Sequence, residues 1–258
     1  MLIVTWNVNS LRARLARVLE LLERHAPDVV CLQETKVEAA AFPHAELAEA
    51  GYAAVEHSAG RWAGVAILAR TDLPLERAVR GLPGESAPDE ARWVEASVAG
   101  MRVASVYVPN GRVVGSEPFA EKLAFFEAIA QRVASWRDEP AAILGDFNVA
   151  PADRDVYDPA AFAGSTHVTE DERRRLAAVL EAGRLRDAYR ELHPAEVGYT
   201  WWDYRQGHFH RKLGLRIDLA LVGGPLAGRV VRCGIDRSFR KGPKPSDHAP
   251  LLVELRGS

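Results

Sequence analysis

Residues 141–148 read Ala-Ala-Ile-Leu-Gly-Asp-Phe-Asn, an apolar run that ends in a glycine followed by polar side chains. A short apolar run of this kind predicts a buried strand, and the glycine allows the backbone to turn at its end. Because side chains two residues apart in an extended chain point to the same side, Asp146 and Asn148 are expected to face one site together. A carboxylate can bind a metal or deprotonate water, and an amide can stabilise a developing oxyanion.

The same pattern, an apolar segment with polar groups at one end, recurs along the chain. Taken alone, Asp146 and Asn148 could be ordinary turn residues. The other segments are 2–6 before Asn7 and Asn9, 29–33 before Glu34, 101–106 before Tyr107, 215–217 before Asp218, and the final run 251–253 after Asp247 and His248. Sites in open sheets gather at strand ends and in the loops beyond them. We therefore expect these side chains to converge on one cleft.

Length and composition bound the class of protein. A chain of 258 residues can bury one large core, and a single catalytic domain over residues 1–258 is expected. No apolar run approaches the length needed to cross a membrane, and the first strand leaves no room for a cleavable leader. A cytoplasmic protein without membrane contact is therefore expected. Cys31 and Cys233 lack partners at zinc-ligand spacing and are interpreted as buried hydrophobes in a reducing compartment.

The charge distribution gives mixed indications about the partner. A net charge of −2 provides no global basic signature, which counts against a nucleic acid. Basic residues nevertheless gather beside Asp218 and Asp247. They are Arg205, Arg211, Lys212 and Arg216 in one cluster, and Arg237, Arg240, Lys241 and Lys244 in the other. Two solvated loops are the alternative, but two clusters bracketing the same cleft favour an anionic substrate.

Helical and extended patterns alternate irregularly. One helix is predicted from Ser10 to just before Pro27, a second from about Pro118 through Val133, and a third from Thr169, which has a capping box, to near Gly183. Short strands lie between them, some in hairpin-like pairs. This order predicts an α/β fold with mixed sheets and helices outside, rather than a purely alternating parallel fold.

The polar groups of the cleft suit one kind of metal. Carboxylate and amide oxygens without thiolates favour Mg²⁺ or Mn²⁺ over zinc or copper, and phosphoryl transfer to water is then the expected reaction class. His248 has Asp247 before it and Asp218 available as an orienting partner. It can stay protonated and stabilise phosphorane charge, or it can accept a proton. The chain contains no P-loop and no serine-hydrolase elbow.

Seven short motifs occur in order between residues 6 and 250. They are Trp6-Asn7-Val8-Asn9, Gln33-Glu34-Thr35-Lys36, Tyr107-Val108-Pro109-Asn110-Gly111, Gly145-Asp146-Phe147-Asn148, Trp201-Trp202-Asp203-Tyr204-Arg205, Leu215-Arg216-Ile217-Asp218 and Ser246-Asp247-His248-Ala249-Pro250. The ordered set resembles the exonuclease III class of abasic-site endonucleases, within the endonuclease/exonuclease/phosphatase superfamily. The resemblance implies a four-layer α-β-β-α sandwich, in which two packed mixed sheets are flanked by helices.

The resemblance also implies a role for each site residue. The implied catalytic residues are Tyr107, Asp146, Asn148, Asp218 and His248. The implied metal site is Glu34, as the main carboxylate, with Asn7, Asp146, Asn148, Asp247 and His248. The implied substrate-binding residues are Asn9, Lys36, Asn110, Trp201, Trp202, Arg205 and Leu215. Of these, Trp201, Trp202 and Leu215 would line an apolar slot for a flipped-out abasic sugar. Plain core packing is the alternative for these three residues.

The implied activity is Mg²⁺-dependent repair of duplex DNA, with Mn²⁺ as the alternative ion. The enzyme would be a monomer that cuts 5′ to an abasic site to leave a 3′-hydroxyl, and that also degrades or trims 3′ ends. The Trp201–Arg205 and Leu215–Asp218 motifs point to this repair branch. A phosphoesterase acting on RNA, a nucleotide or an inositol phosphate stays open as an alternative, as does a non-catalytic DNA-binding or scaffold protein.

Overall fold

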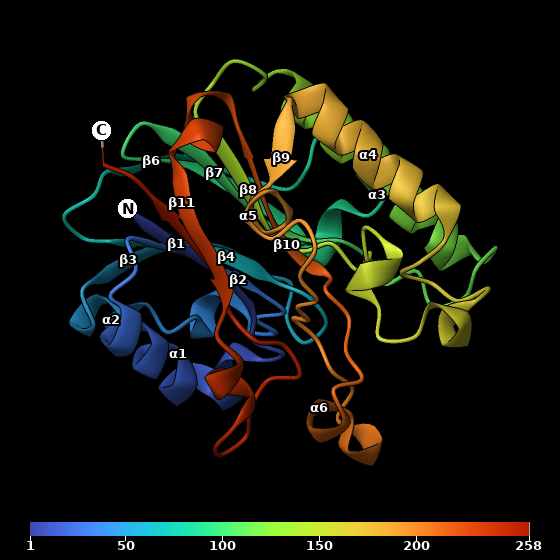
Figure 1. Ribbon diagram of the computed structural model, residues 1–258. Helices are drawn as coiled ribbons and strands as arrows, with labels where there is room; N and C mark the ends of the chain where they lie inside the picture. Colours follow the sequence, from blue (N-terminus) through green and yellow to red (C-terminus); the bar gives the residue numbers. More distant parts are fainter. Residues whose placement is uncertain (258) are drawn as a thin grey trace.

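The computed structural model describes residues 1–257 and contains two six-stranded sheets packed face to face (Figure 1). The first sheet has the order β11-β12-β1-β2-β4-β3. Its strands are β1 (Leu2–Asn7), β2 (Val29–Gln33), β3 (Tyr52–His57), β4 (Val65–Arg70), β11 (Val230–Ile235) and β12 (Leu251–Leu255). The second sheet has the order β5-β6-β7-β8-β10-β9. Its strands are β5 (Leu75–Arg80), β6 (Trp93–Val98), β7 (Met101–Tyr107), β8 (Ala141–Asp146), β9 (Leu185–Asp187) and β10 (Asp218–Gly223).

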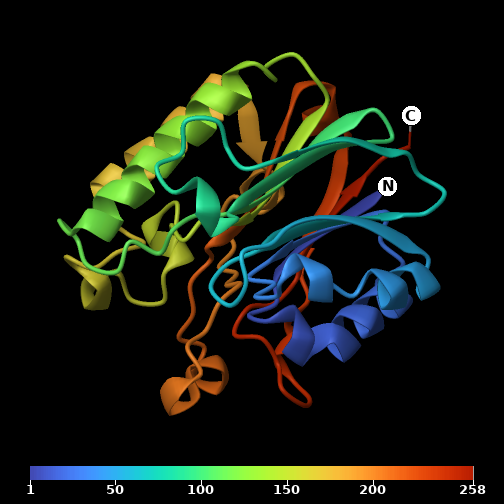
Figure 2. The same cartoon turned by 180° about the vertical axis from the view of Figure 1, so that it is seen from behind.

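Helices cover the outer face of each sheet, which completes four layers. α1 (Leu11–His25) and α2 (His44–Glu49) lie outside the first sheet, whereas α3 (Glu117–Ala134) and α4 (Glu170–Gly183) pack together outside the second (Figures 1 and 2). The short helices α5 (Ala188–Leu192) and α6 (His208–Arg211) follow, and α6 projects away from the sheets (Figures 1 and 2). The predicted α/β sandwich with mixed sheets is confirmed, because each sheet contains parallel and antiparallel pairs.

The helix boundaries follow local chemistry. The side chain of Ser10 accepts a hydrogen bond from the backbone of Ala13 and caps α1. α4 begins with the predicted capping box between Thr169 and Glu172. α3 begins at Glu117, one residue before the predicted start, because Ser116 caps it. α2, α5 and α6 were not predicted; each has six residues or fewer, too short for a clear helical period.

Three apolar layers hold the sandwich together. Alternate side chains of the two sheets meet in the central layer, which includes Ile3 and Val103. Phe126 and Ile129 of α3 belong to a second layer against the outer face of the second sheet. α1 contributes Leu21 to a third layer against the first sheet. No helix within residues 1–257 combines the length and the apolar character needed to cross a membrane.

The polar strand ends meet at one edge of the sandwich. β1 runs parallel to β2, and β7 runs parallel to β8, so these strands end on the same side. β10 and β12 run antiparallel to their neighbours and therefore begin at that edge. The prediction of a strand at 215–217 that ends at Asp218 is wrong, because Leu215 makes only isolated bridges and β10 starts at Asp218. Asp218 still reaches the shared edge, since it pairs directly with Asp146.

Candidate active site

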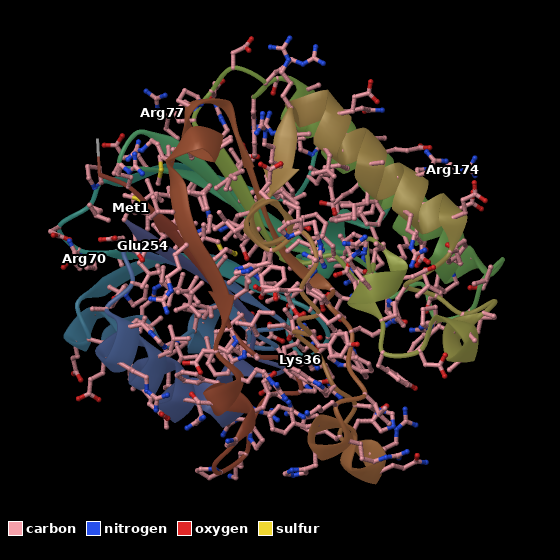
Figure 3. All side chains as sticks on the ribbon, in the orientation of Figure 1. Met1, Lys36, Arg70, Arg77, Arg174 and Glu254 are labelled. Carbon is pink, nitrogen blue, oxygen red and sulfur yellow. The ribbon has the colours of Figure 1, made fainter. Side chains whose placement is uncertain are left out.

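At the shared edge of the sandwich, the carboxylates of Glu34 and Asp146 both accept hydrogen bonds from the amide of Asn7. Asn7 lies at the end of β1, and its Nδ2 donates to Glu34 Oε1 at 2.7 Å and to Asp146 Oδ2 at 2.9 Å. Glu34 follows β2 with a φ of 51°, a left-handed conformation that turns the chain away from the strand. The ammonium of Lys36 lies 2.6 Å from the second oxygen of Glu34. The predicted residues Asn7, Glu34, Lys36 and Asp146 therefore form one cluster. Lys36 lies on the side of the sheets from which α6 projects, whereas Met1 and Glu254 lie away from that side (Figure 3).

The donor set of this cluster fits a divalent cation. Glu34, Asp146 and His248 each offer one ligand atom, and these atoms lie within 4.8 Å of one another. Two carboxylates with room for water are typical of Mg²⁺ sites. A histidine must be unprotonated to bind a metal, and the surroundings of His248 favour its protonated form. Of these three residues, Glu34 and Asp146 offer the carboxylate oxygens that Mg²⁺ prefers.

His248 is held as part of a carboxylate–imidazole pair. Its Nδ1 lies 2.8 Å from Asp218 Oδ2, and its Nε2 lies 3.7 Å from Asp146 Oδ2. Burial by itself lowers the pKa of His248, but the charge and hydrogen bond of Asp218 outweigh it and raise that pKa to about 10. Burial raises the pKa of Asp146, and the charge of His248 opposes that shift. An imidazolium therefore faces the position where substrate phosphate would meet the carboxylates.

The backbone around His248 is fixed by further polar contacts. Ser246 Oγ donates to Asn7 O at 2.7 Å and accepts from His248 N at 3.2 Å. Thr200 Oγ1 accepts from the backbone N–H of Asp218 at 3.1 Å. Trp6 Nε1 donates to His248 O at 3.0 Å. These bonds join the ends of β1, β10 and β12 into one frame.

Asn148 forms the other wall of the site. Its backbone N–H donates to Asp146 Oδ1 at 2.8 Å, and its Nδ2 donates to Val108 O at 2.9 Å. Asn110 Nδ2 lies 3.4 Å from Asn148 Oδ1. Tyr107 is opposite Asp146 in the sheet, and the pKa of its phenol is raised by burial and then by the charges of Glu34 and Asp146. Asn110, Asn148 and Tyr107 are thus gathered at the predicted site.

Asp247 is ionised and held by neutral donors beside the carboxylate cluster. Asn9 Nδ2 donates to Asp247 Oδ1, and Trp201 Nε1 donates to Asp247 Oδ2, both at 3.0 Å. Burial opposes ionisation of Asp247, but the charge of His248 and these two hydrogen bonds lower its pKa. Lys36 Nζ donates to Asn9 Oδ1 at 2.7 Å and so connects Asn9 to Glu34. Asp247 does not belong to the group of potential ligand atoms around Asp146.

Two residues predicted to line a sugar slot are buried instead. Trp202 is 1% exposed and Leu215 is 0% exposed. Trp202 packs edge-on against Phe209 with the ring centroids 5.1 Å apart. Trp202 follows Trp201 and points to the opposite side, as successive residues of an extended segment do. Leu215 packs with Val156 and Ile217, and Trp201 lies against that cluster. Trp201 is half-buried and lines, with Arg205, a cavity of 280 Å³.

Part of the predicted basic surface is also internal. Arg216 is fully buried, and it donates to Asp155 Oδ1 and to Asp187 Oδ2, both at 2.7 Å. Arg240 is 7% exposed and donates to the main-chain oxygen of Ser246. These two arginines support the site loops and do not face a substrate, which corrects the prediction from charge clustering.

Several supporting residues were not predicted as part of the site. Lys122 Nζ donates to Asn148 O at 2.7 Å and pairs with Glu172. His167 lines the cavity beside Trp201, and its Nδ1 lies 2.5 Å from Asn148 O. A signal was present for Lys122, because it is the one cation on an apolar face of α3. The position of Glu172 in the sequence indicates only a helix cap, and no motif marks His167.

Over nearly its whole length, the chain is similar to known nucleases. Residues 4–248 match the model of the endonuclease/exonuclease/phosphatase family. Exodeoxyribonuclease III of Haemophilus influenzae is 32% identical, with 98% of this chain and 99% of the relative covered. An exodeoxyribonuclease of Bacillus subtilis is 30% identical, with 97% and 98% covered.

Solved structures of related enzymes have the same fold over nearly the whole chain. An AP endonuclease from Archaeoglobus fulgidus superposes with a TM-score of 0.94 at 38% identity, covering 99% of both chains. A 3′-5′ exonuclease from Neisseria meningitidis superposes with a TM-score of 0.95 at 39% identity, covering 100% of both chains. With this likeness and the match over residues 4–248, the chain belongs to the endonuclease/exonuclease/phosphatase family.

Proposed function

We propose that the protein is a Mg²⁺-dependent phosphodiesterase of DNA repair. It cuts duplex DNA on the 5′ side of an abasic site to leave a 3′-hydroxyl, and it removes nucleotides or blocking groups from 3′ ends. The observation that carries the proposal is the convergence of Glu34, Asp146 and His248 within 4.8 Å at one edge of the sandwich. Two carboxylates beside an imidazolium suit the hydrolysis of an anionic phosphate ester.

The chemistry assigned to the site follows from its donors and acceptors. Glu34 and Asp146 hold the cation, which when bound neutralises phosphate charge and favours ionisation of water. Asp146 orients the attacking water and accepts its proton. His248, kept protonated by Asp218, donates to a phosphate oxygen, and Asn148 lies beside the same position. Tyr107 lies opposite Asp146 in the sheet and assists the leaving oxygen.

The substrate class rests on the proteins that the chain resembles. The Archaeoglobus relative is named for abasic-site incision and the Neisseria relative for 3′-5′ exonuclease activity. A structure of the Neisseria 3′ phosphatase, 39% identical with a TM-score of 0.95, holds a product DNA hairpin. From that likeness we infer that this chain also acts on DNA, at abasic sites and at 3′ ends. The same proposal includes a cytoplasmic monomer with one catalytic domain over residues 1–258.

Cleavage of an end-labelled duplex with one synthetic abasic site tests the proposal. The reaction is run with Mg²⁺, with Mn²⁺ and with chelator, for the wild type, Glu34→Ala and the matched surface variant Glu196→Ala. A metal-dependent cut 5′ to the lesion that only Glu34→Ala loses supports the proposal. Shortening from the 3′ end without incision would restrict the function to 3′-end processing. An intact duplex under all conditions would overturn the proposal and direct the search to RNA, nucleotide and inositol phosphate substrates.

A further inference from the structure

One large aromatic side chain stands exposed beside the candidate active site. Trp62 is 77% exposed, the highest value among the large apolar residues that the structure describes. The other tryptophans are buried or half-buried. Single exposed apolar residues are common on proteins, so the surroundings of Trp62 decide its meaning.

The segment that carries Trp62 is attached to the loop that carries Glu34. The backbone N–H of Thr35 donates to Gly64 O at 3.1 Å, and that of Lys36 donates to Ala63 O at 2.8 Å. These bonds place Trp62 immediately before a segment, Ala63 and Gly64, that is fixed to the loop after Glu34. The indole is therefore presented on a fixed support rather than on a free loop.

A cavity connects the indole with the catalytic groups. It has a volume of 510 Å³ and is lined by Trp62, Tyr107, Pro109 and Asn110 among others. This volume falls within the range of roughly 300–1,000 Å³ that is common for ligand sites. Asn110 lies 3.4 Å from Asn148 and Tyr107 is opposite Asp146, so the cavity begins where the scissile phosphate is proposed to lie.

The lining favours a flat, uncharged group. Asp89, Glu90 and Glu121 also line the cavity, and their negative charge opposes a phosphate there. The Arg92 guanidinium is already engaged, because it pairs with Glu90 and lies 4.8 Å from the centre of the Tyr107 ring. A nucleobase meets these conditions, since it is neutral and presents a π face to an indole.

We propose that Trp62 is a stacking platform for the base of the nucleotide on one side of the scissile phosphate. The inference rests on the proposed function, because it assumes a DNA strand at the site. The subsite distinguishes an ordinary flanking nucleotide from one without a base.

Binding of a fluorescein-labelled hairpin oligonucleotide in chelator tests the platform without relying on catalysis. Trp62→Ala is expected to weaken binding by roughly 5- to 150-fold, the range that base–aromatic stacking gives. Trp62→Phe retains a π face and should recover most of the affinity. Trp62→Leu retains bulk without a π face and should not. Val197→Ala removes another exposed apolar side chain, away from this cavity, and should bind as the wild type does.

A second series identifies the base that stacks. Cleavage is measured on duplexes in which the nucleotide on one side or the other of the scissile phosphate lacks its base. On only one of these substrates should Trp62→Ala cleave as fast as the wild type, because the base that stacks on Trp62 is already absent there. Wild-type affinity in Trp62→Ala, or equal affinities of the Leu and Phe variants, would overturn the platform while leaving the proposed function intact. Failure of the wild type to bind DNA would overturn the proposed function and the platform with it.

Discussion

The buried ammonium of Lys122 donates a 2.7 Å hydrogen bond to the main-chain oxygen of Asn148. The same ammonium reaches Asn110 O at 3.2 Å and pairs with Glu172, and the side chains of both partners in that ion pair are 0% exposed. Lys122 belongs to α3 and Glu172 to α4. A buried ion pair between two outer helices thus fixes the two loops that carry the predicted amide groups of the site.

Removal of the Lys122 charge is expected to destabilise the protein strongly. Lys122→Met leaves Glu172 buried without its cation and should lower the free energy of unfolding by about 3–5 kcal/mol. Urea denaturation followed by circular dichroism measures this change. Lys241→Met, which removes an exposed lysine, serves as the matched control and should unfold within about 0.5 kcal/mol of the wild type. Equal midpoints for the two variants would contradict the assigned role of the pair.

The same pair should make stability depend on acidic pH. Burial tends to raise the pKa of Glu172, but the charge and hydrogen bond of Lys122, with bonds from His167 and Thr169, lower it below its ordinary value of 4.5. A carboxyl with a depressed pKa in the folded state stabilises the protein above its unfolded pKa, and this contribution is lost as pH falls through the folded pKa.

Urea midpoints measured between pH 3 and pH 7 test this dependence. Below about pH 4.5 the wild type should lose stability more steeply than Glu172→Gln, whose amide cannot titrate. The difference in urea midpoint between the wild type and Glu172→Gln should be constant above pH 6. Parallel curves over the whole range would show that Glu172 does not carry this pH dependence.

Asp218 is expected to control His248 through their 2.8 Å hydrogen bond. Asp218→Asn removes the charge that raises the pKa of His248, and it removes the acceptor that orients the ring. Cleavage should slow by about 10²- to 10⁴-fold, the usual size of a contribution from a positioned proton donor. The imidazole proton resonances of His248 should titrate at lower pH in the variant.

A second aspartate–histidine pair supplies the control for that variant. His25 Nε2 lies 2.9 Å from Asp236 Oδ2, and this pair lines a different cavity. Asp236→Asn should leave the cleavage rate within about twofold of the wild type. Equal rate losses in the two variants would mean that disturbed folding, rather than the loss of an oriented His248, causes the effect.

The sequence predicts the parts of the fold that depend on local patterns. Apolar runs mark the strands, and the capping box at Thr169 marks the start of α4. The polar residues beside those runs predict one shared site, and Asn7, Glu34 and Asp146 do meet there. The sequence predicts that Asp218 ends a strand, but Asp218 begins β10. The direction of that strand is set by its antiparallel pairing with β8, which no local pattern shows.

The structure differs from the sequence-based expectation at the site where long-range contacts bury a side chain. Arg216 stands in a basic stretch and looks solvated, yet its partners Asp155 and Asp187 are 61 and 29 residues away in the chain. Trp202 lies next to a site residue but points to the opposite side, into a cluster with Phe209. Burial of a charged or aromatic side chain is set by tertiary packing, which local composition does not encode.

Gly145, within the stretch that predicted the fold, lies at a close approach of two strands. It pairs with Val106 in the parallel β7–β8 pair, and a Cβ built on Gly145 would lie 1.9 Å from Val106 O. Because that contact is with backbone, Gly145→Ala must separate the strands beside Tyr107 and Asp146. We expect a loss of at least about 3 kcal/mol in unfolding free energy, at the upper end for an overpacked core.

A glycine in an edge strand provides the comparison. Gly234 lies in β11, and a Cβ there would meet nothing within 4 Å. Gly234→Ala should therefore stay within about 0.5 kcal/mol of the wild type in urea denaturation and should retain activity. Gly145→Ala should lose activity even under conditions where it stays folded, since Asp146 follows directly after the displaced residue. Equal stability of the two variants would contradict the described register of β7 against β8, on which the position of Asp146 depends.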